Sequence, residues 1–274
     1  MPELPEVETI RVGLEPHLVG RTFVRVEIDD VRLTRPHDPV ETAAELTGET
    51  VAALERRGKY LVVRFESGRV LLIHLRMTGS LLLLRDGIAI DDPYRRAVVR
   101  LDNDSDVAYR DVRRFGTWLL LEPGELDPYL ASRVGAEVLD RGFSTQALQA
   151  TVERRKAPIK AVLLDQRVFA GVGNIYADEA LWWARIHPLR PAASLDLPEL
   201  QDLLRGVRKS LRHGIARQGA TLRDYRGADG RAGSMQREFR AYGRAGEPCT
   251  RCGTPIEKTR AGGRGTWYCP GCQL

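Results

Sequence analysis

The sequence predicts a multidomain α+β protein, with an N-terminal helix, a β-sandwich or barrel, a helical part and a C-terminal cysteine-rich hairpin. Apolar residues follow helical spacing at the start, short strand-like runs fill residues 22–121, and helical periodicity returns over about 144–219. Every cysteine lies in the last 26 of the 274 residues. This length suits one large domain or two to three small ones.

The opening segment fits a helix. Pro5 suits the first helical turn, and Gly20 is a suitable stop. Four apolar residues follow helical spacing: Val7, Ile10, Leu14 and Leu18.

Seven short, partly alternating runs follow and predict strands at 22–28, 50–57, 59–66, 69–76, 80–85, 97–102 and 117–122. Turns such as ESGR, RDG and DNDSD separate them. This spacing favours a sandwich or a barrel.

Helices are predicted in PIKAVLLDQ (158–166), NIYADEALWWARI (174–186) and DLPELQDLLRGVRKSLRHGI (196–215). Residues 220–240 are polar, with Gly and Arg, and predict a flexible loop.

Charge is uneven along the chain. The net charge is +5, but residues 201–274 hold 15 basic and 6 acidic side chains. A basic C-terminal quarter indicates a polyanionic partner. No apolar run reaches the length of a membrane span, and the acidic, Pro-rich start is unlike a signal peptide, so we expect a soluble cytosolic protein.

The cysteines form the pattern C-x2-C-x16-C-x2-C. This spacing predicts a Zn²⁺ site with four thiolate ligands: Cys249, Cys252, Cys269 and Cys272. Four thiolates leave no open position, so the zinc would be structural. The alternative is two disulfides, which a cytosolic chain disfavours.

The segment between the cysteine pairs predicts a β-hairpin with Arg264 between Gly263 and Gly265 near its tip. Arginine can bind phosphate through two parallel hydrogen bonds, and glycines allow close approach of a ligand. The alternative is a solvated arginine on a turn.

Pro2 follows Met1. Removal of the methionine would leave a secondary amine, and an α-amino group is partly unprotonated at neutral pH. Such an amine can form an iminium with an aldehyde-like carbon and so enable elimination. Glu3 and Glu6 are close enough in sequence to move protons. The alternative is that Pro-Glu only opens a helix.

Three motifs then coincide: PELPEVE at the N-terminus, GVGNIYADEALW in the helical part, and the terminal cysteine pattern. Together they resemble the bacterial formamidopyrimidine-DNA glycosylase family. The resemblance implies a bifunctional DNA glycosylase/AP lyase with a β-sandwich, a helix–two-turn–helix segment and a C-terminal four-cysteine zinc-finger hairpin. It implies domains at 1–130, 131–240 and 241–274, with a loop at about 217–237 that closes over the everted base.

The resemblance also implies catalytic roles. Pro2 would attack C1′ of the damaged nucleotide, with Glu3 as general acid and base. Lys59, matching a β-strand lysine of the family, would contact phosphate and assist β-elimination; the alternative is a strand-edge lysine that deters aggregation. Arg264 would bind the lesion phosphates and serve δ-elimination.

The implied DNA contacts are more numerous. Met77, Arg113 and Phe115 would fill the void left by the flipped base, unless Met77 and Phe115 are ordinary core residues. Five residues would lie near the DNA backbone: His74, Arg114, Lys156, Asn174 and Tyr242. Lys160 is a further candidate. Tyr94 stands where many family members carry histidine, so its contact is open.

The sequence therefore predicts an enzyme of base excision repair that removes oxidised purines from double-stranded DNA. It would act as a cytoplasmic monomer, associated with the nucleoid through DNA and carrying one structural zinc ion. PEL after Met1, RRFG and the long loop favour the purine branch. Two alternatives stay open: an endonuclease VIII-like enzyme for oxidised pyrimidines, and a non-catalytic zinc-ribbon DNA-binding protein.

Overall fold

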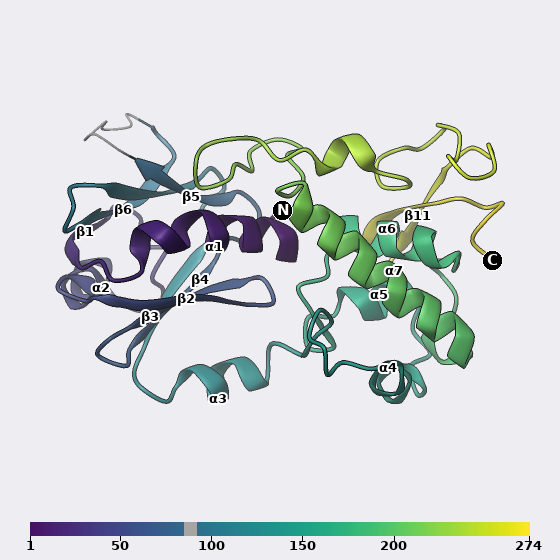
Figure 1. Ribbon diagram of the computed structural model, residues 1–274, viewed down its shortest axis with the longest axis horizontal. Coiled ribbons are helices and arrows are strands. Elements are labelled where there is room, and N and C mark those ends of the chain that lie inside the picture. The colour runs from purple at the N-terminus through teal and green to yellow at the C-terminus, as the bar shows by residue number, and fades with distance from the viewer. Residues whose placement is uncertain (85–91) are drawn as a thin grey trace. The chain divides into compact units, whose positions relative to one another are not determined.

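The structure is a computed structural model that describes residues 1–84 and 92–274 (Figure 1). It divides into two compact units. Unit 1 comprises Met1–Leu130 and Arg217–Ser234, and unit 2 comprises Ala131–Ala216 and Met235–Leu274. The domain boundaries given above stay a prediction. The expected turn at 85–87 lies outside the described residues. Among those described, no helix has the length and apolarity needed to cross a membrane.

Unit 1 begins with α1 (Leu4–Leu18). A reciprocal capping box starts the helix, in which the Glu3 side chain accepts the Glu6 N–H and the Glu6 side chain accepts the Glu3 N–H. The four apolar residues with helical spacing are all buried. The predicted N-terminal helix is confirmed.

Two separate antiparallel sheets follow, so the fold is a sandwich rather than a barrel. One sheet has the order β1 (Phe23–Ile28), β6 (Arg95–Leu101), β7 (Asp106–Asp111), β5 (Gly79–Leu84). The other has the order β2 (Val51–Arg57), β3 (Tyr60–Phe65), β4 (Val70–His74), β8 (Thr117–Leu121).

Two elements of unit 1 are absent from the sequence prediction. The helix α2 (Pro39–Leu46) lies between β1 and β2, and the carboxylate of Asp38 caps it by accepting the N–H groups of Val40 and Glu41. The strand β7 lies between the last two predicted strands, where the sequence suggested only a connection. At both places the prediction of 22–121 as seven strands was wrong.

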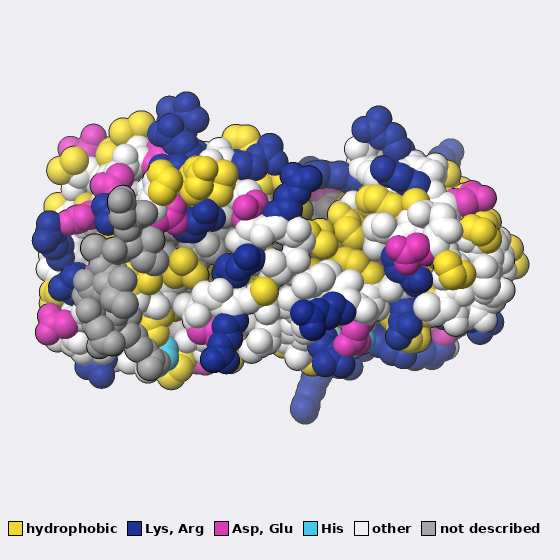
Figure 2. Space-filling model, turned by 90° about the horizontal axis from the view of Figure 1, so that it is seen from above, with side chains coloured by type: hydrophobic (Ala, Val, Ile, Leu, Met, Phe, Trp, Pro, Cys, Tyr) yellow, Lys and Arg dark blue, Asp and Glu magenta, His cyan; other side chains and the backbone are white. Residues whose placement is uncertain are grey.

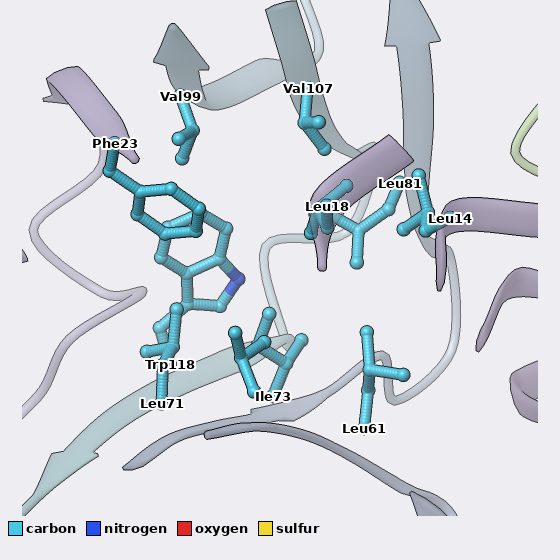
Figure 3. A pocket seen from close by; sticks show the side chains of 11 residues that line it. Leu14, Leu18, Phe23, Leu61, Leu71, Ile73, Leu81, Val99, Val107 and Trp118 are labelled. Atoms are coloured by element: carbon cyan, nitrogen blue, oxygen red, sulfur yellow. The ribbon is translucent and has the colours of Figure 1, made fainter. Parts of the chain in front are cut away.

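Side chains from both sheets and from α1 form one apolar core. Figure 3 shows a small apolar cavity within it, with Val99 and Val107 on one side and Leu61, Leu71 and Ile73 on the other. Leu14 and Leu18 of α1 also line this space, which shows that the helix completes the sandwich core.

Unit 2 is mostly helical. The short helix α3 (Leu126–Ala131) precedes it. Its elements are β9 (Ala136–Glu137), α4 (Thr145–Val152), α5 (Ile159–Leu164), β10 (Phe169–Ala170), α6 (Asn174–Ala184), α7 (Leu197–Ala216), and the hairpin β11 (Glu257–Ala261) and β12 (Arg264–Tyr268), with 3₁₀ turns at Ala192–Ser194 and Met235–Glu238. The three predicted helices and the predicted hairpin are confirmed.

Helices α6 and α7 pack closely because α7 carries a glycine where they touch. A Cβ added to Gly206 would lie 2.5 Å from the carbonyl oxygen of Ala180. No larger side chain fits there without separating the helices.

Candidate active site

The strand registers bring three loops to one end of the sandwich. The start of β3 pairs with the end of β4 at His74, and His74 pairs with the start of β8. The turn 58–59 and the loops 75–78 and 112–116 therefore lie at this end. The two loops also join the sheets, because they connect β4 to β5 and β7 to β8.

The N-terminus of α1 lies at the same end. Arg11 Nη1 donates to the carbonyl oxygen of Leu54 at 3.3 Å, and Arg56 Nε donates to Glu8 at 3.0 Å. The earlier residue of α1, Glu8, contacts the later residue of β2, Arg56, so the helix and the strand run antiparallel. The start of α1 is thus directed towards the β2–β3 turn.

Three predicted catalytic residues belong to this end of unit 1. Pro2 is buried, and the side chains of Glu3 and Lys59 are 1% and 7% exposed. Lys59 lies in the β2–β3 turn after Gly58, whose φ is +57°, and not within a strand as expected. Its burial also excludes the alternative of an exposed edge lysine.

Glu6 links the N-terminus to the segment 217–234. Its Oε2 accepts the N–H of Glu3 at 2.8 Å, and its Oε1 accepts the N–H of Ala220 at 2.7 Å. A Cβ on Gly219, which has φ +78°, would lie 2.8 Å from the Glu6 side chain. The structure therefore gives Glu6 a clear positioning role, while its part in proton transfer stays a prediction.

The predicted void-filling residues stand on the loops at this end. Phe115 is 50% exposed, so the alternative of a core phenylalanine is wrong. The guanidinium of the exposed Arg113 lies over its ring, 4.7 Å from the centroid. Met77 is half-buried. An exposed apolar ring is a side chain of the kind that can insert between base steps, so the exposure of Phe115 is compatible with its predicted role.

His74 is buried and uncharged at neutral pH. Burial, assisted by the charges of Arg76 and Lys59, lowers its pKa to about 3. Its Nδ1 accepts the N–H of Arg76 at 3.0 Å, which leaves the proton on Nε2. A neutral ring with one N–H can donate a single hydrogen bond, and its predicted phosphate contact would use that donor.

Two further predicted DNA contacts in unit 1 already have partners within the protein. Arg114 donates to both oxygens of Asp30, at 2.6 and 2.7 Å, and this pairing lowers the pKa of Asp30. Tyr94 is 39% exposed and has Arg110 over its ring. Their contacts with DNA stay predictions.

In unit 2, Arg264 opens β12 directly after the turn Gly262–Gly263, where both residues have positive φ. Two such residues match the type I′ turn that suits a two-residue hairpin. Arg264 is exposed. Asn174, the first residue of α6, donates through Nδ2 to the carbonyl oxygen of Gly265 at 3.0 Å. The hairpin tip is therefore fixed to the start of α6.

Lys160 is fully buried and anchors the same hairpin. Its Nζ lies 2.7 Å from Asp178 Oδ1 and donates to Gly265 O at 2.9 Å and to Thr266 Oγ1 at 2.8 Å. Asp178 in turn accepts the N–H of Trp267. The suggestion that Lys160 contacts the DNA backbone is wrong, because its side chain is 0% exposed.

Glu179 organises the chain that enters the zinc finger. Its buried carboxylate accepts the N–H groups of Arg240, Ala241 and Tyr242. Burial raises the pKa of Glu179, and these donors oppose the rise. The ring of Tyr242 lies 4.6 Å from that of Trp267. Sequence reasoning assigned no role to the acidic pair at 178–179, although the pair stands within the motif GVGNIYADEALW.

The remaining predicted contact in unit 2 is Lys156, which is exposed just before α5. Lys and Arg side chains dominate the charged surface on the face drawn in Figure 2. Such a surface suits a polyanionic partner.

The four cysteine sulfur atoms lie within 4.8 Å of one another. All four are free, so the alternative of two disulfides is wrong. A Zn–S distance of about 2.3 Å requires sulfurs clustered in this way. Cys249 and Cys269 are buried against Trp182, Ala241 and Ile256, which form a small core around the site. The residues present fit one structural zinc ion.

Comparison with known proteins covers nearly the whole chain. Family models match in three segments: the formamidopyrimidine-DNA glycosylase N-terminal domain at 1–118, its H2TH domain at 134–226, and the zinc finger found in FPG and IleRS at 246–274. The chain belongs to the formamidopyrimidine-DNA glycosylase family. Members from Herpetosiphon aurantiacus and Geobacillus kaustophilus are 43% and 45% identical to it, over 100% of both chains in each case.

Solved structures of this family agree with the fold. A variant of the Lactococcus lactis glycosylase in complex with Fapy-dG-containing DNA matches with a TM-score of 0.93 and 36% identity over 100% of both chains. The wild-type Lactococcus lactis protein with DNA containing an oxidised pyrimidine gives a TM-score of 0.92 at 36% identity, again over 100% of both chains. Family membership makes this chain a DNA glycosylase of base excision repair with a C-terminal zinc finger, as the sequence predicted.

Proposed function

We propose that this chain removes oxidised purines, 8-oxoguanine and formamidopyrimidines, from double-stranded DNA and then cleaves the abasic site. The main support for the proposal is the arrangement at one end of the sandwich. The start of α1, Lys59 and the loops 75–78 and 112–116, which carry Met77, Arg113 and Phe115, lie together there. An enzyme that acts on a base in a duplex must flip that base out, and a nucleophilic N-terminus beside groups that can fill the void suits this task.

The reaction would begin at Pro2 after loss of Met1. Its secondary amine attacks C1′, the C1′–base bond breaks, and the base leaves with a proton supplied through Glu3. The bound nitrogen then loses its proton, its lone pair breaks the C1′–O4′ bond while O4′ takes up a proton, and the product is an iminium between Pro2 and the ring-opened sugar. The positive end of the α1 dipole, two residues away, favours the neutral amine that attacks.

Two eliminations would follow from the iminium. Loss of the C2′ proton breaks the C3′–O bond, and Lys59 would contact the phosphate that leaves. Loss of the C4′ proton then breaks the C5′–O bond, with the second phosphate held by Arg264. Hydrolysis of the iminium frees Pro2 and leaves a gap of one nucleotide. The zinc ion would hold the hairpin that carries Arg264 and would take no part in bond breaking.

Flipping the base costs a few kcal/mol, and filling the void offsets part of that cost. The exposed Phe115 and Arg113 and the half-buried Met77 would enter the stack.

The domains would be 1–130, 131–240 and 241–274. We also place the activity at the nucleoid within the cytoplasm, where the DNA substrate lies; imaging of a fluorescent fusion before and after DNA damage tests this.

Borohydride trapping on a duplex with 8-oxoguanine opposite cytosine tests the chemistry. We expect a covalent adduct whose mass maps to an N-terminal peptide starting at Pro2. Protein that keeps Met1 should give no adduct. An adduct on another residue, or full activity with Met1 in place, would refute the role of Pro2.

Oxidised pyrimidines are a second candidate substrate class. The relative from Lactococcus lactis with 36% identity has been solved with DNA containing an oxidised pyrimidine. Excision of thymine glycol and of 8-oxoguanine, measured side by side under single-turnover conditions, separates the two. Faster excision of thymine glycol would assign this chain to the pyrimidine-preferring branch.

A further inference from the structure

One buried carboxylate ties together the two loops that carry the wedge residues. Asp111, at the end of β7, is 1% exposed. Its Oδ2 accepts the N–H groups of Phe115 at 3.0 Å and Gly116 at 2.8 Å. Its Oδ1 accepts the N–H of Arg113 at 3.2 Å. A single side chain thus holds the backbone of loop 112–116 at three points.

The same carboxylate reaches the other loop through Thr78. The hydroxyl of Thr78 donates to Asp111 Oδ1 at 2.5 Å and accepts the N–H of Arg113 at 3.0 Å. Thr78 directly follows Met77. The position of Met77 is therefore coupled to that of Arg113 through the two hydrogen bonds of Thr78.

Backbone geometry leaves these loops little freedom to adjust. Arg114 has a φ of +58°, and its guanidinium is held by Asp30. A Cβ on Gly116 would lie 1.6 Å from the hydroxyl oxygen of Tyr109, and one on Gly79 would lie 2.5 Å from the same atom. Loop 112–116 is thus bound at Asp111 and at Asp30, with Tyr109 packed beneath it.

We infer that Asp111 is a positioning residue for lesion recognition, which presents Met77, Arg113 and Phe115 to the duplex as one rigid wedge. The inference rests on the proposed function, because it takes these three side chains to fill the void. Asp111 is buried and would touch neither DNA nor the reacting atoms. Its effect would pass only through the two loops that it holds.

The test compares duplex and single-stranded substrates. Asp111→Asn keeps the size of the side chain but turns one acceptor oxygen into an NH₂ group, which faces N–H donors. Misplacement of a group by about 1 Å can cost about 100-fold in rate, so we expect kcat/KM for 8-oxoguanine excision from duplex DNA to fall roughly 10- to 100-fold. Borohydride trapping on a single-stranded abasic oligonucleotide, where no void exists, should change less than about 2-fold.

A second pair of variants tests the same inference if Asp111→Asn folds poorly. Thr78→Val removes the hydroxyl but keeps the shape, and we expect a smaller, roughly 5- to 10-fold loss on the duplex alone. Thr78→Ser keeps the hydroxyl and should retain wild-type excision. Equal losses in Thr78→Val and Thr78→Ser would show that packing, and not the hydrogen bond, matters.

The deciding measurement is whether the effect of Asp111→Asn depends on the three wedge side chains. In a Met77→Ala, Arg113→Ala, Phe115→Ala background, adding Asp111→Asn should lower duplex excision by less than about 2-fold. Three outcomes would overturn the inference. Asp111→Asn could lower duplex excision as much in that background as in the wild-type protein, could lower excision and single-strand trapping equally, or could leave duplex excision unchanged. Failure of the wild-type protein to excise or trap would instead refute the proposed function.

Discussion

Replacing Lys160 with methionine tests how far unit 2 depends on one buried ion pair. Lys160 Nζ lies 2.7 Å from Asp178 Oδ1, and both side chains are 0% exposed. Methionine fills most of the space but leaves the carboxylate buried without its cation. Breaking such a pair by removing one partner costs about 3–5 kcal/mol. We expect a loss of this size in the free energy of unfolding at pH 8.5.

The loss should depend on pH in a defined direction. Burial raises the pKa of Asp178 to about 7, and Lys160 opposes that rise. Without Lys160 the folded pKa should be higher still. A raised carboxyl pKa gives stability at low pH that is lost as pH rises towards the folded pKa. Above pH 7, the cost of Lys160→Met should therefore grow by up to about 1.4 kcal/mol per pH unit, and it should be smaller at pH 6.

Urea unfolding of the zinc-loaded protein, followed by tryptophan fluorescence at pH 6 and 8.5, measures this cost. Three of the four tryptophans belong to unit 2. The matched control is Lys160→Met with Asp178→Asn, which removes both charges of this pair and should show no growth in cost above pH 7. A loss below about 1 kcal/mol at pH 8.5, or equal losses at both pH values, would refute the reasoning.

Three further outcomes follow from the structure. His74, with its pKa lowered to about 3, should account for about 2 kcal/mol of the free energy of unfolding that is lost between pH 7 and 5, because the unfolded ring takes up a proton that the folded ring does not. Urea titrations of His74→Gln at the two pH values should show a loss that is smaller by this amount. A loss as large as in the wild-type protein would contradict the burial argument. Val107→Ile adds a methylene to the cavity of unit 1 and should raise the free energy of unfolding by about 1 kcal/mol, seen as a higher Tm; a lower Tm would mean that the added carbon does not fit. Cys249→Ser should lower the bound zinc and duplex affinity, measured by metal analysis and fluorescence anisotropy, before it affects trapping; normal affinity with lost lyase activity would contradict a structural zinc.

Local patterns in the sequence predicted the parts of the fold that local physics determines. Helical spacing of Val7, Ile10, Leu14 and Leu18 identified α1 because those four residues face the core. The cysteine spacing predicted the zinc site because two pairs of thiolates suffice for a tetrahedron. The family motifs extended this to the predicted catalytic residues.

What sequence reasoning missed depends on tertiary contacts. β7 is short and flanked by aspartates, and only pairing with β5 and β6 makes it a central strand. The helix α2 did have a local signal, because Asp38 before Pro39 is a typical N-cap. The burial of Lys160 has no such signal, since nothing nearby in sequence reveals that Asp178 and the hairpin backbone enclose it.

The place of residues 217–234 in unit 1 has a consequence for synthesis of the protein. This segment bonds to α1 through Glu6 and to β5 through Leu83, whose N–H donates to the carbonyl oxygen of Ala228 at 2.9 Å. The ribosome releases it only after all of α7 has been translated. The first 130 residues are therefore synthesised before the segment that bonds to the edge strand β5. A stop codon before position 217 would leave β5 without this segment.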